Sequence, residues 1–271
     1  MKKTVVERTF MQEYDSIAEF YKYLCDTPFN SAFRWEEHHS TVHSARQTRW
    51  SQTRSFEQAT ELLKNGWDDM AKKLQNRLKS KDIQMHPVKQ QRNVLSVQGY
   101  QPVVPLYLAG APQNMISKQM RPVKQKVVNI VKSLNYSCCV TSDEIIEESI
   151  KVMQVVKTLE SQGMKCNIYI ALGTEAGGRK LICKVKIKGA SERLNISKLA
   201  FPLVHPSMLR RLMLRYIEVC PDATEAYVGT YGYPVSVEGM KKMMPNDIVL
   251  PARWKIDVND VHSLDEVLGT V

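Results

Sequence analysis

The chain has 271 residues, a net charge of +10 and 43% hydrophobic residues, enough for one large domain or a medium domain with a smaller attachment. No apolar run reaches the roughly 18 residues that a membrane span needs, and Met1-Lys2-Lys3-Thr4 leads into charged residues without an apolar stretch. We therefore expect no membrane partner, no secretory signal and a cytoplasmic location.

The first 80 residues predict helices. In the stretch 16–24 the apolar residues share one helical face. Ser55 and Gln58 have the spacing of an N-terminal capping box, and Gly66 is a typical helix stop. A second amphipathic pattern covers residues 70–78.

The region 84–125 differs, because its five prolines exclude long helices. Short strands or extended arms are predicted there, for example at 94–97 and 103–108.

A regular unit follows. Val127–Val131 has the pattern of a strand, Thr141 and Glu144 form a capping box, Gly163 ends the helix, and Cys166–Leu172 is the next strand. This order predicts a βαβ unit, which has a parallel strand pair and a right-handed crossover. Further elements are a hairpin-like connection at Gly177-Gly178, a strand at 181–188, a helix at 206–219 and a strand at 248–250, so the fold class is α/β.

No catalytic motif is visible. The glycine-rich segment 173–180 lacks the GK[ST] order of a phosphate loop, and no serine lies in GxSxG. None of the six cysteines forms a CxxC pair, so we expect reduced, structural thiols. These features predict a protein that is not an enzyme and holds no cofactor.

One cluster contains metal-ligand side chains, namely His38, His39 and His43. His39 and His43 are four residues apart and would share a helical face, but the HExxH order is absent. The alternative is a polar helix face or loop, and the sequence leaves both open.

Basic residues are unevenly distributed. From Ile83 to Ser142 there is no Asp or Glu, while seven Lys and Arg residues occur there, which favours a polyanionic partner. Arginines also accompany tryptophans, a combination that suits single-stranded nucleic acid. The predicted nucleic-acid-binding residues are Arg34, Trp35, Arg46, Arg49, Trp50, Lys124, Lys126, Lys184, Lys186 and Lys188.

Each of these residues also has a structural interpretation. The tryptophans can be core anchors beside arginines whose stems cover apolar surface. The lysine row 184–188 can protect an edge strand against aggregation. Charge alone can also reflect a soluble basic surface without a specific partner.

Four blocks resemble a family of uncharacterised tailed-bacteriophage proteins. They are Ser55-Phe56-Glu57-Gln58-Ala59 through Asn65-Gly66-Trp67, Pro105 to Gly110, Val127 to Ile146, and Leu199-Ala200-Phe201 to Leu212. The resemblance covers roughly residues 50–220. It implies a phage origin and a location in the host cytoplasm, but no particular activity.

The second half also resembles a degenerate von Willebrand factor A domain, which has a doubly wound, mostly parallel sheet. That family places DxSxS after its first strand to bind a divalent ion, and here Asn135, Ser137 and Cys139 stand at the matching places. Hard cations need oxygen ligands, preferably charged. The resemblance thus implies the scaffold at 116–271 without bound metal, preceded by a mixed, basic region at 1–115.

Two functional hypotheses follow. The first is a phage protein that binds nucleic acid, with single-stranded DNA favoured, and that recruits the transcription or replication machinery, such as a phage polymerase or ATPase. The alternative is a protein-interaction adaptor, a partner of a phage ATPase or assembly factor without a nucleic-acid role. Convergence of the basic residues on one groove favours the first, and their scatter favours the second.

Overall fold

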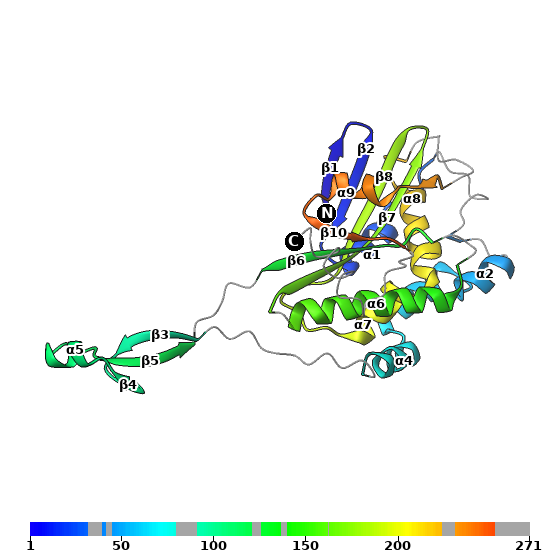
Figure 1. Cartoon of the computed structure of the whole chain (residues 1–271). Coiled ribbons are helices and arrows are strands. Elements are labelled where there is room, and N and C mark those ends of the chain that lie inside the picture. Colours follow the sequence, from blue (N-terminus) through cyan, green and yellow to red (C-terminus); the bar gives the residue numbers. More distant parts are fainter. Residues whose placement is uncertain are drawn as a thin grey trace.

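A computed structural model describes residues 1–31, 40–41, 45–79, 91–120, 126–136, 140–161, 163–223 and 231–252. Figure 1 shows a body built on a large sheet with helices on both faces, and a smaller sheet that stands away from it. None of the described helices is long and apolar enough to cross a membrane.

The strands of the body are β1 (Lys2–Val6), β2 (Thr9–Tyr14), β6 (Val127–Ser133), β7 (Lys165–Ala176), β8 (Arg179–Lys188), β9 (Tyr233–Pro234) and β10 (Asp247–Leu250). Its helices are α1 (Ile17–Asp26), α2 (Ala45–Ser51), α3 (Phe56–Asn65), α4 (Asp68–Lys79), α6 (Ser142–Ser161), α7 (Ile196–Val204), the π-helix η2 (Met208–Met213), α8 (Leu214–Val219) and α9 (Val237–Met243). The smaller unit contains β3 (Gln91–Ser96), β4 (Gln101–Pro102), α5 (Val104–Leu108) and β5 (Met115–Met120).

The seven-stranded sheet has the order β1-β2-β8-β7-β6-β10, with β9 on β7. The pairs β2/β8, β6/β7 and β6/β10 are parallel, and the pairs β1/β2, β7/β8 and β7/β9 are antiparallel. Four of the strands, β1, β7, β6 and β10, therefore run in one direction. The predicted α/β class and the predicted parallel pair β6/β7, joined by the long helix α6, are confirmed.

Both faces of this sheet are apolar. Ile130 and Ile168 point into the larger core beneath α1, α6, α7 and η2, while their neighbours Val131 and Tyr169 point to the opposite face. There α9 covers the sheet with Met240 and other side chains. A strand covered on both faces needs apolar residues at consecutive positions, which explains the continuous apolar runs in β6 and β7.

The predicted local signals operate as expected. The Thr141 amide and hydroxyl donate to the Glu144 carboxylate, and the Glu144 amide donates back to the Thr141 hydroxyl. Gly177 and Gly178 have φ of 57° and 71°, which suits a tight hairpin between β7 and β8.

The N-terminal strands belong to the main sheet. Strand β1 pairs with β2, β2 pairs in parallel with β8, and Tyr14 is buried in the larger core. The predicted boundary at 115/116 coincides with the start of β5 at Met115 and stays a prediction.

The prediction of an extended segment at 103–108 is wrong, because Val104–Leu108 is the short helix α5. Pro105 lies in its first turn, where the absent N–H has no intrahelical partner to lose.

His205 anchors the junction between α7 and η2. Its ring stacks on the Phe201 ring, with 4.9 Å between the ring centres, and lies 4.6 Å from the centre of the Trp67 ring system. Its Nδ1 accepts a hydrogen bond from the Ser207 amide at 3.1 Å. Burial lowers the pKa of His205 from its usual 6.5 to about 4.

We predict that this imidazole weakens the fold in acid. Between pH 6.5 and about 4 the unfolded chain takes up a proton here and the folded chain does not. The free energy of unfolding should therefore fall by about 3 kcal/mol over this interval at this site. His205→Asn keeps an acceptor for the Ser207 amide but cannot titrate, so its urea-unfolding curves should depend less on pH than those of the wild type. Equal pH dependence in both proteins would contradict the prediction.

Candidate functional site

The small sheet and α5 form a separate unit, the arm, residues 91–120 (Figure 1). Strands β3 and β5 pair antiparallel from Gln91↔Met120 to Ser96↔Met115, and β4 pairs with the other side of β5. The connection passes so close to β5 that a Cβ on Gly99 would lie 2.2 Å from the Ile116 carbonyl oxygen. Only glycine fits there.

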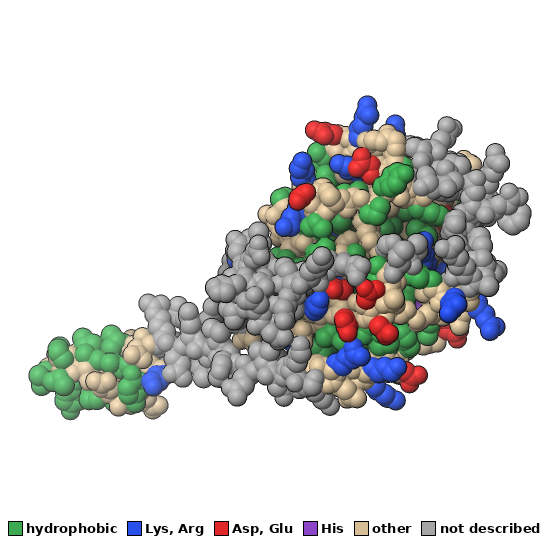
Figure 2. All heavy atoms as spheres, turned by 45° about the vertical axis from the view of Figure 1, so that its right-hand side comes forward, with side chains coloured by type: hydrophobic (Ala, Val, Ile, Leu, Met, Phe, Trp, Pro, Cys, Tyr) green, Lys and Arg blue, Asp and Glu red, His purple; other side chains and the backbone are tan. Residues whose placement is uncertain are grey.

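The arm does not bury its own apolar side chains. Among residues 93–118, whose side chains are described, none is buried. On the face that Figure 2 shows, hydrophobic side chains cover most of the arm, with polar side chains and backbone between them. The large side chains that are between 49% and 79% exposed are Leu95, Val97, Tyr100, Val104, Tyr107 and Leu108. An apolar surface of this kind, contiguous and projecting, is typical of an interaction site.

Three of these exposed apolar side chains lie on α5, at the tip of the arm. Val104, Tyr107 and Leu108 follow the i, i+3, i+4 spacing of one helical face, and all three are exposed. Such a triplet is the usual anchor when a short helical segment enters an apolar groove.

Charge is nearly absent from the same surface. Residues 93–118 contain one charged side chain, Lys118. Its ammonium lies 5.2 Å above the ring of Tyr100, whose hydroxyl donates to Asn93 Oδ1 at 3.3 Å. Residues 93–118 thus offer apolar area and backbone groups rather than a phosphate-binding surface.

The predicted lysine row occupies the main sheet instead. Lys184 is buried, with its ammonium 2.5 Å from Asp247 Oδ2, 3.3 Å from Glu13 Oε1 and 4.1 Å from the centre of the Tyr169 ring. Glu13 is on β2, the neighbour of β8 on one side, and Asp247 is on β10, at the far edge of the sheet on the other side. The Lys184 ammonium therefore links three strands, β2, β8 and β10.

The other two lysines of the row are also paired. Lys186 contacts Asp15 at 3.1 Å. A bulge opposite Ile168 turns Lys188 toward α6, where it contacts Glu160 at 2.8 Å and donates to the Cys166 carbonyl at 3.1 Å. Strand β8 lies between β2 and β7, so it is not an edge strand.

The remaining predicted residues do not gather around this row. Trp50 is half-buried, donates its Nε1–H to the Val140 carbonyl at 3.0 Å, and has the Arg210 guanidinium 4.9 Å from its ring. Arg49 on α2 and Lys126 before β6 are exposed at opposite ends of the body (Figure 1). Arg34, Trp35 and Lys124, as well as the side chain of Arg46, lie outside the described part of the chain.

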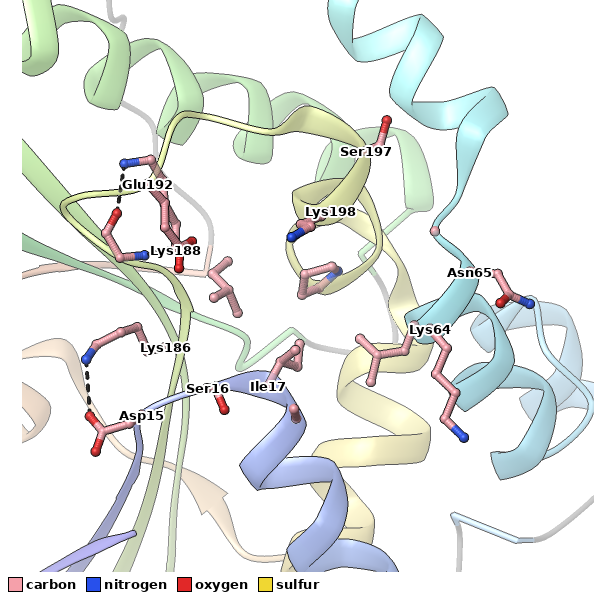
Figure 3. Close-up of a pocket in the computed structure, with 16 residues that line it drawn as sticks. Asp15, Ser16, Ile17, Lys64, Asn65, Lys186, Lys188, Glu192, Ser197 and Lys198 are labelled. Atoms are coloured by element: carbon pink, nitrogen blue, oxygen red, sulfur yellow. Dashed lines mark hydrogen bonds and ion pairs between the residues drawn. The ribbon is translucent and has the colours of Figure 1, made fainter.

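A cleft of about 520 Å³ lies at the carboxyl ends of β2 and β8, beside the first turns of α1 and α7. Figure 3 shows the paired Lys186 and Asp15 on one wall and Lys64 and Asn65 on the opposite side. Lys64 donates to the Tyr21 hydroxyl at 3.0 Å. Neither His nor Cys lines this cleft, so its lining residues supply no nucleophile with a neighbouring imidazole base.

The predicted metal positions are only partly described. The Asn135 side chain donates to the Gly173 carbonyl at 2.9 Å and accepts the Gly173 amide at 3.3 Å, so it joins the segment after β6 to strand β7. Ser137 and Cys139 lie outside the described residues, as do the three histidines of the cluster at 38–43. Within the described ranges no three His, Cys, Asp or Glu side chains are placed to hold a metal ion. Both metal predictions stay predictions.

The family of this chain is known from its sequence match. A family model for a domain of unknown function, DUF7192, matches residues 2–270. The chain belongs to this family. The DUF7192 chain matches no curated protein and no solved structure.

The arm is the surface that sequence reasoning missed. The available signals are the prolines and the apolar run 103–108 in a region without acidic residues. They correctly exclude long helices and predict a short strand at 94–97, most of which lies in β3, whereas the absence of acidic residues points to a polyanionic partner.

We predict that Lys184 is structural. Lys184→Met leaves Asp247 and Glu13 without their shared cation in a buried setting, which should cost about 3–5 kcal/mol of unfolding free energy. Lys186→Met is the matched control on the same strand. Its partner Asp15 is largely exposed, so its loss should cost about 0–1 kcal/mol. Similar losses for both variants in urea unfolding would refute the structural role.

Proposed function

We propose that this protein functions by binding another protein, with the arm as the docking element and the body as its support. The observation that carries this proposal is the lack of any buried side chain at residues 93–118, where six large apolar side chains are exposed. Association would remove this surface from water, which is the main favourable contribution to most protein complexes.

The chemistry of the arm favours a protein partner over a nucleic acid. Binding to a phosphate backbone depends on Lys and Arg contacts. The described side chains of the arm supply only Lys118, and Lys184, Lys186 and Lys188 are each engaged by a carboxylate. The fitting partner has an apolar surface and an open strand edge, without a requirement for charge.

The resemblance of residues 50–220 to tailed-bacteriophage proteins gives this proposal a setting. In that setting the protein is an adaptor for an assembling phage particle or a phage ATPase. Both this setting and the likeness of the core to a von Willebrand factor A domain rest on the sequence alone.

Photo-crosslinking tests the class of partner. A photoreactive phenylalanine in place of Leu108 keeps the tip apolar, and the same residue in place of the exposed Lys72 on α4 is the control. We expect protein adducts from position 108 that resist nuclease and that are about tenfold weaker in a Tyr107→Ser background, because truncation of a central aromatic anchor weakens binding strongly. Equal adducts from both positions, or adducts that nuclease removes, would contradict the proposal.

A further inference from the structure

We infer that the partner of the arm is a second copy of this chain, and that the two arms pair through the outer edges of their β3 strands. This inference rests on the proposed function and names its partner. It describes a two-fold dimer in which two three-stranded sheets become one continuous sheet.

The edge of β3 is available for pairing. In the order β3-β5-β4 this strand is outermost, and among the described residues only β5 pairs with it. Its outer N–H and C=O groups therefore have no strand partner in that part of the chain, and such an edge is a template for strand addition.

The second half of β3, Asn93 to Ser96, also lacks the usual protection. Natural edge strands carry lysine, proline or bulges that discourage pairing. The body follows this rule, since its edge strand β1 carries Lys2 and Lys3. In β3 the charged residue is Arg92 near the start of the strand, whereas Asn93 to Ser96 contain neither charge nor proline, and their pairing with β5 is regular. The second half of β3 is therefore the part of this edge that is open to strand addition.

Charge favours the arm as the self-association surface. A two-fold interface places each residue near the same surface of the other copy, so like charges oppose each other. The whole chain carries +10, whereas the arm, residues 91–120, carries two positive charges, Arg92 and Lys118. Two copies can therefore approach along their arms with less repulsion than along their bodies.

The arm also has the faces that such a contact needs. Leu95 lies opposite Ile116 in the register, and Tyr100 lies against Asn93 and Lys118 at the next positions on that face. Pairing of two β3 strands would bring two such apolar faces side by side in one sheet.

Sedimentation velocity of the full chain between about 1 and 100 µM in 150 mM salt tests the inference. We expect a concentration-dependent monomer–dimer equilibrium. Leu95→Lys places like charges at the shared edge and should weaken the dimer at least about tenfold. Val5→Lys, at a residue of similar exposure on the edge strand β1 (55% against 49%), is the matched control and should leave the dimer unchanged.

Thermal melts of both variants show whether the body stays folded, which we expect because the described core clusters contain no arm residue. A chain that is monomeric at every concentration overturns the inference, and so does a dimer that Val5→Lys disrupts and Leu95→Lys does not. Neither result touches the proposed function, because adducts from position 108 to a different protein would still support it.

Discussion

An apolar sheet face is stable in water only when another layer covers it, and this requirement organises the whole chain. Both faces of the large sheet are covered, one by α6, α7 and η2 and the other by α9. The sheet of the arm has a five-residue helix at its tip, and no described side chain at 93–118 is buried. The same physical rule that explains the body therefore leaves the arm incomplete as a monomer.

The lysines of strand β8 are paired within the fold, in contrast to the uncovered apolar side chains of the arm. Lys184, Lys186 and Lys188 look in the sequence like a solvent-facing row, but each meets a carboxylate from a distant part of the chain. The ammonium of Lys184 connects β8 to β2 and β10 across the face of Tyr169. The row thus contributes to cohesion of the sheet, and these three lysines are engaged within the fold.

Local signals in the sequence predicted local structure well. The capping boxes at Ser55 and Thr141, the glycine hairpin at 177–178 and the βαβ unit from β6 to β7 depend on residues that are close together in the chain, so spacing reveals them. The addition of β2 beside β8 depends on pairing of residues 9–14 with residues 180–185, which no local pattern encodes.

The candidate site was less predictable for the same reason. The ion-pair partners of the lysines come from β2, β10 and α6, and only the assembled fold reveals them. The exposure of Tyr107 and Leu108 depends on the absence of a covering layer, whereas composition shows only that these residues are apolar. The sequence therefore predicts that the arm lacks long helices, but not that it is exposed.

Hydrogen exchange at the arm amides, measured at several protein concentrations, tests the central claim most directly. We expect the amides of β3 and β5 to exchange quickly in dilute solution and to become protected as the chain associates, while the amides of β7 stay protected throughout. Protection of β3 and β5 in the dilute monomer that equals that of β7 would contradict the claim that the arm needs a partner to complete its packing.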